Sequence, residues 1–112
     1  MMIYKIFRSN EWQDLQAQGD TAGAPIDLAD DYIHFSTATQ AQETADKHFA
    51  QVEGLYLAAV DGAALGGDIK WEVSRGGAEF PHLYRRLQLD DVVWCLPLPL
   101  IDGRHKFPDQ MT

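Results

Sequence analysis

The chain has 112 residues, which is enough for one small domain with one hydrophobic core but not for two. Hydrophobic residues make up 46% and charged residues 23%, the composition of a folded globular protein rather than of a disordered one. Acidic residues outnumber basic ones by 17 to 9. The resulting net charge of −8 disfavours nucleic-acid binding, because a phosphate backbone is bound mainly through Lys and Arg.

The single cysteine, Cys95, excludes an intrachain disulfide and a cysteine metal cluster. No apolar run approaches the roughly 20 residues of a membrane helix, and the first residues become polar too soon for a signal peptide. We therefore expect a cytoplasmic protein without a membrane partner. It is expected to form one α+β domain over residues 1–101, followed by a loosely held tail at 102–112. The sequence carries no indication of the oligomeric state.

The first part of the chain predicts a strand, a helix and a loop. Residues 3–7 are strong strand formers with alternating side chains. Asn10 is placed to cap a helix over residues 11–18, which Gly19 would end. Residues 19–31 are rich in Gly, Ala, Asp and Pro, a composition that favours a surface loop.

Residues 32–36 predict a short strand that runs directly into a helix. Ile33 and Phe35 alternate with His34 and Ser36, so the apolar pair faces the core while the polar pair shares the other face. This arrangement presents an imidazole and a hydroxyl side by side.

The helix after this strand begins with a capping box, Thr37 and Gln40, and is predicted over residues 38–52. Further strands are predicted over residues 55–60, 69–74, 87–89 and 92–96. In the second of these, alternation places Ile69, Trp71 and Val73 inward and Lys70, Glu72 and Ser74 outward. Pro97 and Pro99 are expected to end pairing of the last strand.

Helices gather in the first half of the chain and strands in the second. This order predicts an α+β fold with a mainly antiparallel or mixed sheet, rather than a regular alternation of strand and helix. Neither GxGxxG nor GxxxxGK[ST] occurs, so no dinucleotide fingerprint and no phosphate-binding loop is present.

Polar side chains that could do chemistry occur in three places. His34 and Ser36 end a strand at the start of a helix, where unpaired N–H groups favour a polar or anionic ligand. Glu72 follows Trp71 on a predicted strand, and His82 shares a face with Tyr84 if that segment is extended. The structural alternatives are a solvated strand face for His34 and Ser36, a surface carboxylate for Glu72, and ordinary edge packing for His82 and Tyr84.

Three kinds of chemistry can use these residues. General acid–base hydrolysis would employ His34 or His82, with Glu72 as the orienting partner. A metal could take His34, His82 and Glu72, but no HExxH or other close ligand pair occurs, so we predict no metal site. Ser36 as a nucleophile lacks the GxSxG elbow.

The motifs also resemble those of a known family. They are Tyr4-Lys5-Ile6 with Glu11-Trp12, Tyr32-Ile33-His34-Phe35-Ser36 with Gln40, Lys70-Trp71-Glu72, and Phe80-Pro81-His82-Leu83-Tyr84. In this order they resemble the bacterial domain of unknown function number 952 over nearly the whole chain. Family members usually carry Gly where this chain has Asp31 and Arg85.

The resemblance implies a fold similar to that of the ADP-ribosyltransferases, a split mixed or antiparallel sheet with two main helices in the N-terminal half. In those enzymes a crevice between the sheet halves holds NAD. The resemblance implies that His34 and Ser36, with Gln40 of the same motif, contact the cofactor. It makes Trp71 or Tyr84 the candidate that stacks on nicotinamide.

Glu72 is then the candidate carboxylate that stabilises a ribosyl cation, and His82 joins it as a catalytic candidate. No cofactor follows from the residues themselves, and NAD is the one that the resemblance implies. The leading hypothesis is therefore an NAD- or ADP-ribose-related transferase, or a nucleotide-binding relative of one. The alternative is a non-catalytic module that binds a small molecule or a peptide in the same His/Ser/Glu pocket.

Overall fold

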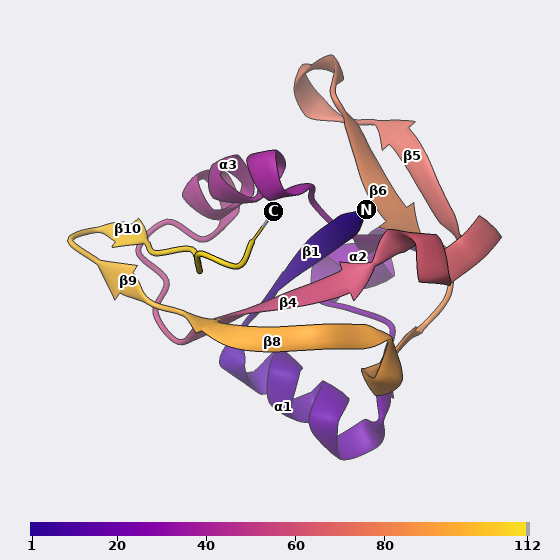
Figure 1. Ribbon diagram of the computed structural model, residues 1–112, viewed down its shortest axis with the longest axis horizontal. Coiled ribbons are helices and arrows are strands. Elements are labelled where there is room, and N and C mark those ends of the chain that lie inside the picture. The colour runs from indigo at the N-terminus through magenta and orange to yellow at the C-terminus, as the bar shows by residue number, and fades with distance from the viewer. Residues whose placement is uncertain (112) are drawn as a thin grey trace.

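Two three-stranded antiparallel sheets form the framework in the computed structural model, which describes residues 1–111 (Figure 1). The strand orders are β1-β4-β8 in the first sheet and β3-β6-β5 in the second. The six strands are β1 (Met2–Phe7), β3 (Ile33–His34), β4 (Leu55–Asp61), β5 (Ile69–Val73), β6 (Glu79–Leu83) and β8 (Val92–Leu98). Together with several helices they confirm the predicted α+β class and its antiparallel pairing.

The two sheets meet where β1 passes the end of β3. The backbone N–H of Tyr4 donates to the carbonyl of Ser36, and the N–H of Ser36 donates back to the carbonyl of Tyr4, both at 2.8 Å. This bridge joins the sheets at the residue that also leads into the helix α3. The polar face of the 32–36 segment therefore lies at the junction of the two sheets.

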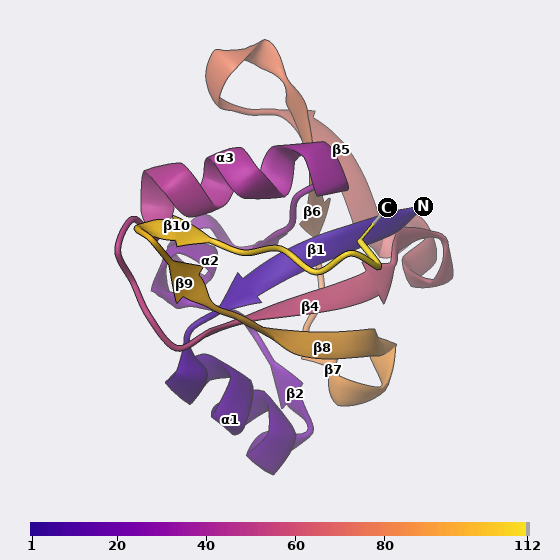
Figure 2. The same ribbon diagram turned by 60° about the vertical axis from the view of Figure 1, so that its left-hand side comes forward.

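Three α-helices surround the first sheet, and their bounds are α1 (Ser9–Gln18), α2 (Pro25–Asp30) and α3 (Ala38–His48). Short 3-10 segments cover Gly62–Asp68, Arg75–Gly77 and Leu89–Asp91. Figure 2 shows α1 and α3 on opposite sides of the first sheet. The capping box of Thr37 and Gln40 at the start of α3 is confirmed. No helix of residues 1–111 is long and apolar enough to cross a membrane.

The core divides into two clusters on the two faces of β4, the central strand of the first sheet. One cluster packs β1 and β4 against α1 and the second sheet, and the other packs them against α3 and the end of the chain. The first cluster includes Ile33 and Phe35, each 2% exposed, so the predicted inward pair of the 32–36 segment is confirmed.

Two predicted helix ends are wrong. Helix α1 begins at Ser9, and its N-cap is Arg8 rather than Asn10, because the Arg8 N–H donates to the Glu11 carboxylate at 2.8 Å. Gly19 ends α1 as predicted, at a φ of 85°. Helix α3 ends at His48 instead of residue 52.

The predicted loop at residues 19–31 is wrong in part, because it contains two regular elements. Strand β2 (Asp20–Thr21) pairs with β7 (Leu87–Gln88), and α2 follows within the same segment. Pro25 occupies the first turn of α2, where its missing N–H needs no partner and its fixed φ suits a helix. Pro25 contributes to the composition that predicts a loop, but in the structure it lies at the start of a helix.

The end of the chain is more firmly held than the expected loose tail. Strand β9 (Leu100–Ile101) pairs with β10 (Arg104–His105). The ring of His105 is buried, with its Nε2 2.8 Å from the carbonyl oxygen of Val52, and Phe107 packs against the second core cluster. The last residue of the expected tail, 112, lies outside the described residues.

Two strand predictions also need correction. Strand β8 continues through Pro97 to Leu98, because it is the edge strand of its sheet and a Pro there removes no ladder donor. On β5, Trp71 and Val73 are 41% and 69% exposed instead of inward. Strand β5 is an edge strand, and its hairpin with β6 projects beyond the body of the molecule (Figures 1 and 2), so no element covers these side chains.

Candidate functional site

Asp27 is the buried anchor of one half of the site. It occupies the third position of α2, after Pro25, so its carboxylate turns back and accepts from the N–H of Ala24 at 2.8 Å. The same Oδ2 oxygen accepts from Nζ of Lys5 at 2.7 Å. The side chain of Asp27 is fully buried and that of Lys5 is 8% exposed. A buried carboxylate is thus placed next to a buried ammonium group.

The other carboxylate oxygen of Asp27 holds His34. Oδ1 accepts from the backbone N–H of His34 at 3.0 Å and lies 2.5 Å from its Nδ1. Burial by itself would raise the pKa of Asp27, but the hydrogen bond from His34 and the charge of Lys5 outweigh it and lower the pKa to about 2. Asp27 is therefore a carboxylate at neutral pH and fixes both the ring and the backbone of His34.

The outer nitrogen of His34 faces a second carboxylate. Nε2 lies 3.0 Å from Oδ2 of Asp30, the last residue of α2. Asp30 is exposed, with 43% of its side chain accessible, whereas the ring of His34 is 30% accessible. A ligand that bound Nε2 would displace only the exposed acid.

A second carboxylate–imidazole pair comes from the β5–β6 hairpin. Oε1 of Glu72 lies 2.8 Å from Nδ1 of His82 and accepts from the Tyr84 hydroxyl at 2.6 Å. The hydrogen bonds from Tyr84 and His82 lower the pKa of Glu72. The hydrogen bond to Glu72 in turn raises the pKa of Tyr84 to about 12. At neutral pH the acid is therefore ionised and the phenol keeps its proton.

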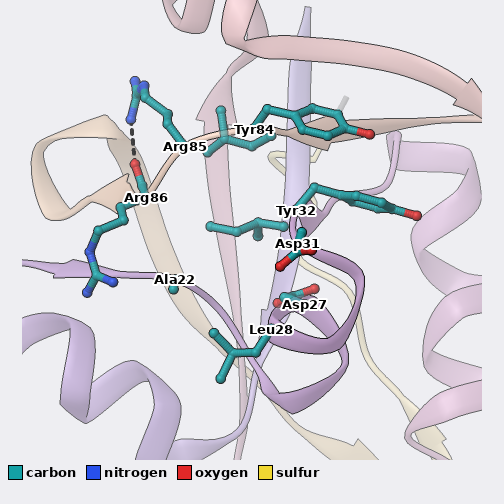
Figure 3. A pocket seen from close by; sticks show the side chains of 10 residues that line it. Ala22, Asp27, Leu28, Asp31, Tyr32, Tyr84, Arg85 and Arg86 are labelled. Atoms are coloured by element: carbon teal, nitrogen blue, oxygen red, sulfur yellow. Dashed lines mark hydrogen bonds between the residues drawn. The ribbon is translucent and has the colours of Figure 1, made fainter.

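Tyr32 joins the two pairs. Its ring stacks on His82 with centroids 4.1 Å apart, lies 4.7 Å from the ring of His34 and 5.2 Å from that of Tyr84. Figure 3 shows the hydroxyls of Tyr32 and Tyr84 pointing the same way. Burial raises the pKa of Tyr32, and the negative charges of Asp30, Glu72 and Asp27 raise it further. We name the set Tyr32, His34, Glu72, His82 and Tyr84 the His–Tyr cluster.

Strand register explains why these residues meet. His34 on β3 is opposite His82 on β6, and His82 is opposite Lys70 on β5, so the three side chains share one face of the second sheet. The ammonium group of Lys70 lies 4.9 Å above the ring of Tyr84. His34 and His82 approach to 5.4 Å between ring centroids. Residues 48 positions apart in sequence thus form one patch.

Three residues expected at the site lie outside the His–Tyr cluster, although Ser36 still lines the cavity described below. Ser36 is buried, and its hydroxyl oxygen lies 3.1 Å from that of Thr44. The side chain of Gln40 accepts from the Thr37 N–H at 3.0 Å and donates to the carbonyl of Glu79 at 2.7 Å, so it ties α3 to β6. Trp71 lies on the face of β5 opposite to Glu72, outside the His–Tyr cluster.

A cavity of about 840 Å³ lies where the two sheets join. Its wall includes Tyr32, His34 and His82 from the His–Tyr cluster, together with Ser36. Further cavity residues with titratable side chains come from β1, α1 and its N-cap, α2 and α3, namely Lys5, Arg8, Glu11, Asp14, Asp30, Glu43, Lys47 and His48. The volume is that of a site for a drug- or nucleotide-sized ligand.

A smaller cavity of about 230 Å³ lies on the other side of Tyr32 (Figure 3). Asp31 and Arg85, the two positions where the resemblance leads us to expect Gly, both line it. Asp31 has a φ of 64°, the left-handed conformation that suits Gly and that Asp tolerates. The guanidinium of Arg85 pairs with Asp91 at 2.9 Å and with Asp68 at 3.3 Å. Tyr32 and Tyr84 of the His–Tyr cluster line the same cavity, so both departures lie next to the cluster.

Sequence reasoning missed the support of His34. The sequence pattern predicts a loop at Asp27 and a turn at Asp30. It predicts a strand at Lys5 but no special role for this residue. The signal for Asp27 was the run Ala24-Pro25-Ile26-Asp27, since a Pro followed two residues later by an acid is a helix start. No such signal exists for Lys5, whose partner is 22 residues away.

Among residues 1–111, no three His, Cys, Asp or Glu side chains are grouped so that they could hold a metal ion. His82 directs Nδ1 to Glu72, and His34 directs Nδ1 to Asp27. Of the three ligands considered, His82 and Glu72 form one carboxylate–imidazole pair, and His34 pairs instead with Asp27.

Comparison with known proteins identifies relatives of known structure. The crystal structure of protein CC0527 from Caulobacter crescentus is 48% identical in sequence, covers 95% of this chain and 94% of its own, and has a TM-score of 0.90. The crystal structure of a double mutant of CC0527 gives the same values. Its solution NMR structure has a TM-score of 0.84, covering 93% of this chain and 90% of its own.

No curated protein matches the chain. Residues 6–95 match the model of the family described as "Protein of unknown function (DUF952)". This match covers most of the chain and includes the whole His–Tyr cluster. As the sequence motifs indicated, the chain therefore belongs to the DUF952 family of proteins of unknown function.

Proposed function

We propose that the protein binds an NAD-class nucleotide in the cavity at the junction of the two sheets and transfers or releases its ADP-ribosyl group. The observation that carries the proposal is that two imidazoles and the phenol of Tyr32 line this cavity beside the carboxylate of Asp30, and that Asp27, Glu72 and Tyr84 contact these rings. The resemblance to the ADP-ribosyltransferases supplies the ligand class. Their NAD crevice also lies between two sheet halves, which is where the 840 Å³ cavity is found.

The charges of the wall suit the nicotinamide end of the ligand. The nicotinamide ring of NAD is flat and cationic, and Tyr32 and Tyr84 offer aromatic faces beside the carboxylates of Asp30 and Glu72. Loss of nicotinamide leaves a ribosyl cation, which a nearby carboxylate stabilises electrostatically. Glu72 is the proposed carboxylate for this role, and Tyr84 replaces Trp71 as the proposed stacking residue.

The diphosphate would lie against another part of the same cavity. Arg8 and Lys47 line it, with the Arg8 guanidinium 3.8 Å from the half-buried Glu11 and the Lys47 ammonium group 2.8 Å from the exposed Glu43. Exposed ion pairs contribute little to stability, so phosphate oxygens can replace Glu43 at small cost. This local supply of cations does not conflict with the net charge of −8.

The alternative, a non-catalytic binding module, is favoured by one observation. Oε1 of Glu72 already accepts hydrogen bonds from His82 and Tyr84. Glu72 is also not one of the described residues that line the larger cavity. A ligand could therefore fill the cavity and touch His34 and His82 without meeting the carboxylate. Binding would then occur without any stabilisation of a cation.

An NMR titration with NAD, ADP-ribose and nicotinamide tests the proposal. We expect saturable amide shifts in residues 33–40, 70–74 and 80–85, and with NAD and ADP-ribose also around Arg8 and Lys47, where the diphosphate is proposed to lie. His34→Ala should weaken them, whereas Trp71→Ala, on the opposite face, should leave the affinity unchanged. If binding is found, release of nicotinamide by the wild type but not by Glu72→Gln supports transfer. Binding in which both proteins release nicotinamide equally, or not at all, favours the non-catalytic module. If no amide shift appears at millimolar ligand, nucleotide binding is excluded.

A further inference from the structure

His82 has a buried ring with one nitrogen unaccounted for. Its side chain is 4% exposed, and Nδ1 is occupied by Glu72 at 2.8 Å. Nε2 has no partner among the residues that the structure describes. Yet no fully buried side-chain nitrogen or oxygen of these residues lacks a partner, so Nε2 must keep contact with open space. Since His82 lines the larger cavity, this space is the cavity.

The proton on the ring can be placed by elimination. The pKa of Glu72 is lowered, so its carboxylate is ionised at neutral pH and only accepts hydrogen bonds. The Tyr84 hydroxyl donates one hydrogen bond to Oε1, and Nδ1 of His82 must donate the other. In the neutral ring the lone pair is therefore on Nε2, the atom that faces the cavity.

Two further contacts fix the ring in this orientation. Tyr32 stacks on one face of His82 with centroids 4.1 Å apart, and His34 meets it at an angle of 72°. Glu72 is positioned to stabilise the imidazolium that forms when Nε2 takes up a proton. The ring is thus held by an acid behind it while a bare nitrogen faces the ligand space.

We propose that His82 is the general base of the reaction and that the acceptor is a hydroxyl group, either of water or of an alcohol. This inference rests on the proposed function. The acceptor oxygen bonds to C1′ of the ribose while the C1′–N bond breaks, its electron pair leaving on the nicotinamide nitrogen. The hydroxyl proton moves to Nε2 of His82. A carboxylate acceptor would need no base, so the free Nε2 selects a hydroxyl.

The bare Nε2 is tested first by long-range ¹H–¹⁵N NMR of the wild type at about pH 8, above the usual imidazole range. His82 should carry its proton on Nδ1. His105 is a matched internal control, because its Nε2 faces the Val52 carbonyl and must donate, which requires the opposite tautomer. A proton on Nε2 of His82 would refute the assignment of His82 as general base, whether or not the protein binds nucleotides.

ADP-ribose is then added to the same sample. A shift of the His82 Nε2 resonance, with that of His105 unmoved, supports contact between ligand and base. If neither shifts while the His82 tautomer is as expected, the proposed nucleotide function fails and the base has no substrate in this cavity. The spectrum without ligand therefore tests His82 as the base, and the spectrum with ADP-ribose tests the proposed nucleotide binding.

His82→Asn tests the catalytic role. The Asn amide can still donate to Glu72 but has no acceptor at the place of Nε2. Nicotinamide release should fall by about 10²- to 10⁴-fold, the usual effect of removing a general base. ADP-ribose affinity should change by less than about threefold. An unchanged rate in a folded His82→Asn protein would overturn the assignment.

Discussion

The two carboxylate–imidazole pairs of the candidate site are built in opposite ways. In the Asp27–His34 pair the acid is fully buried and the imidazole is 30% exposed. In the Glu72–His82 pair the imidazole is 4% exposed and the acid is 40% exposed. In the first pair the buried group is a charged carboxylate, which needs a compensating charge. In the second pair the buried group is the imidazole, and its carboxylate stays accessible to solvent or to a ligand.

The difference has a physical cause in the supporting elements. Asp27 lies on α2, which packs against β3, so its charge is out of water and depends on Lys5. Glu72 lies on an edge strand of a projecting hairpin, where water screens the charge. We therefore expect changes in the first pair to affect stability and changes in the second to affect local ionisation and reactivity.

The largest effect is expected for Lys5→Met, which removes the positive partner of the buried acid. Asp27 would keep His34 but lose its ammonium group, and breaking a buried ion pair costs on the order of 3 kcal/mol. The free energy of unfolding, measured by urea denaturation, should fall by about this amount.

A double-mutant cycle supplies the control for Lys5→Met. In Lys5→Met/Asp27→Asn the charge is no longer buried, so the two losses should not add and the coupling should exceed about 1 kcal/mol. Additive losses would mean that the ion pair does not hold this half of the site together, and the contrast between the halves would disappear.

A smaller effect is expected from acid. The pKa of Asp27 falls from its ordinary 3.8 to about 2 on folding. A lowered pKa stabilises the fold at pH values above the ordinary pKa, and this stabilisation is lost as the pH falls through 2. Between about pH 5 and pH 2, Asp27 should account for a loss of about 2 kcal/mol.

The acid effect is isolated by comparing the wild type with Asp27→Asn in urea denaturation at both pH values. Asn cannot ionise, so the variant should lose less stability on acidification than the wild type by that amount. Parallel losses in the two proteins would show that the pKa of Asp27 is not lowered, because the effect of burial then cancels the effects of His34 and Lys5.

The same contrast explains which parts of the site the sequence predicted. His34, Glu72, His82 and Tyr84 were recognised because they lie on short alternating segments, where period two and the motifs mark a shared face. These residues meet because the strand order of the second sheet is β3-β6-β5. Strand β6 is central in this sheet although it comes last of the three along the chain. Register between distant strands is a tertiary property that local patterns do not encode.

The supporting residues were harder to predict. Asp27 lies in a helix of only six residues, in a segment whose Gly, Ala and Pro content favours a loop. Trp71 was predicted inward because alternation defines which residues share a face but not which face is covered. That depends on neighbouring elements, and none covers the projecting hairpin at Trp71. Burial of an edge strand therefore could not follow from its own sequence.

The smallest effect is expected at the exposed half, for Glu72→Gln. Stability should change little, but the pKa of Tyr84, held at about 12 by the carboxylate, should fall toward its ordinary value of 10.0. At about pH 11 Tyr84 should then be mostly a phenol in the wild type and mostly ionised in Glu72→Gln. The ¹³C shift of the ring carbon that bears the hydroxyl reports this state directly.

Trp71→Ala, on the opposite face of the same strand, should leave the Tyr84 titration unchanged. An unaltered Tyr84 in Glu72→Gln would mean that the carboxylate is not held between Tyr84 and His82 in solution. The proton on His82 could then no longer be assigned to Nδ1, because that assignment depends on Glu72 being an ionised acceptor. A change at this exposed acid, although nearly silent in stability, therefore decides whether the buried imidazole presents a bare nitrogen to the cavity.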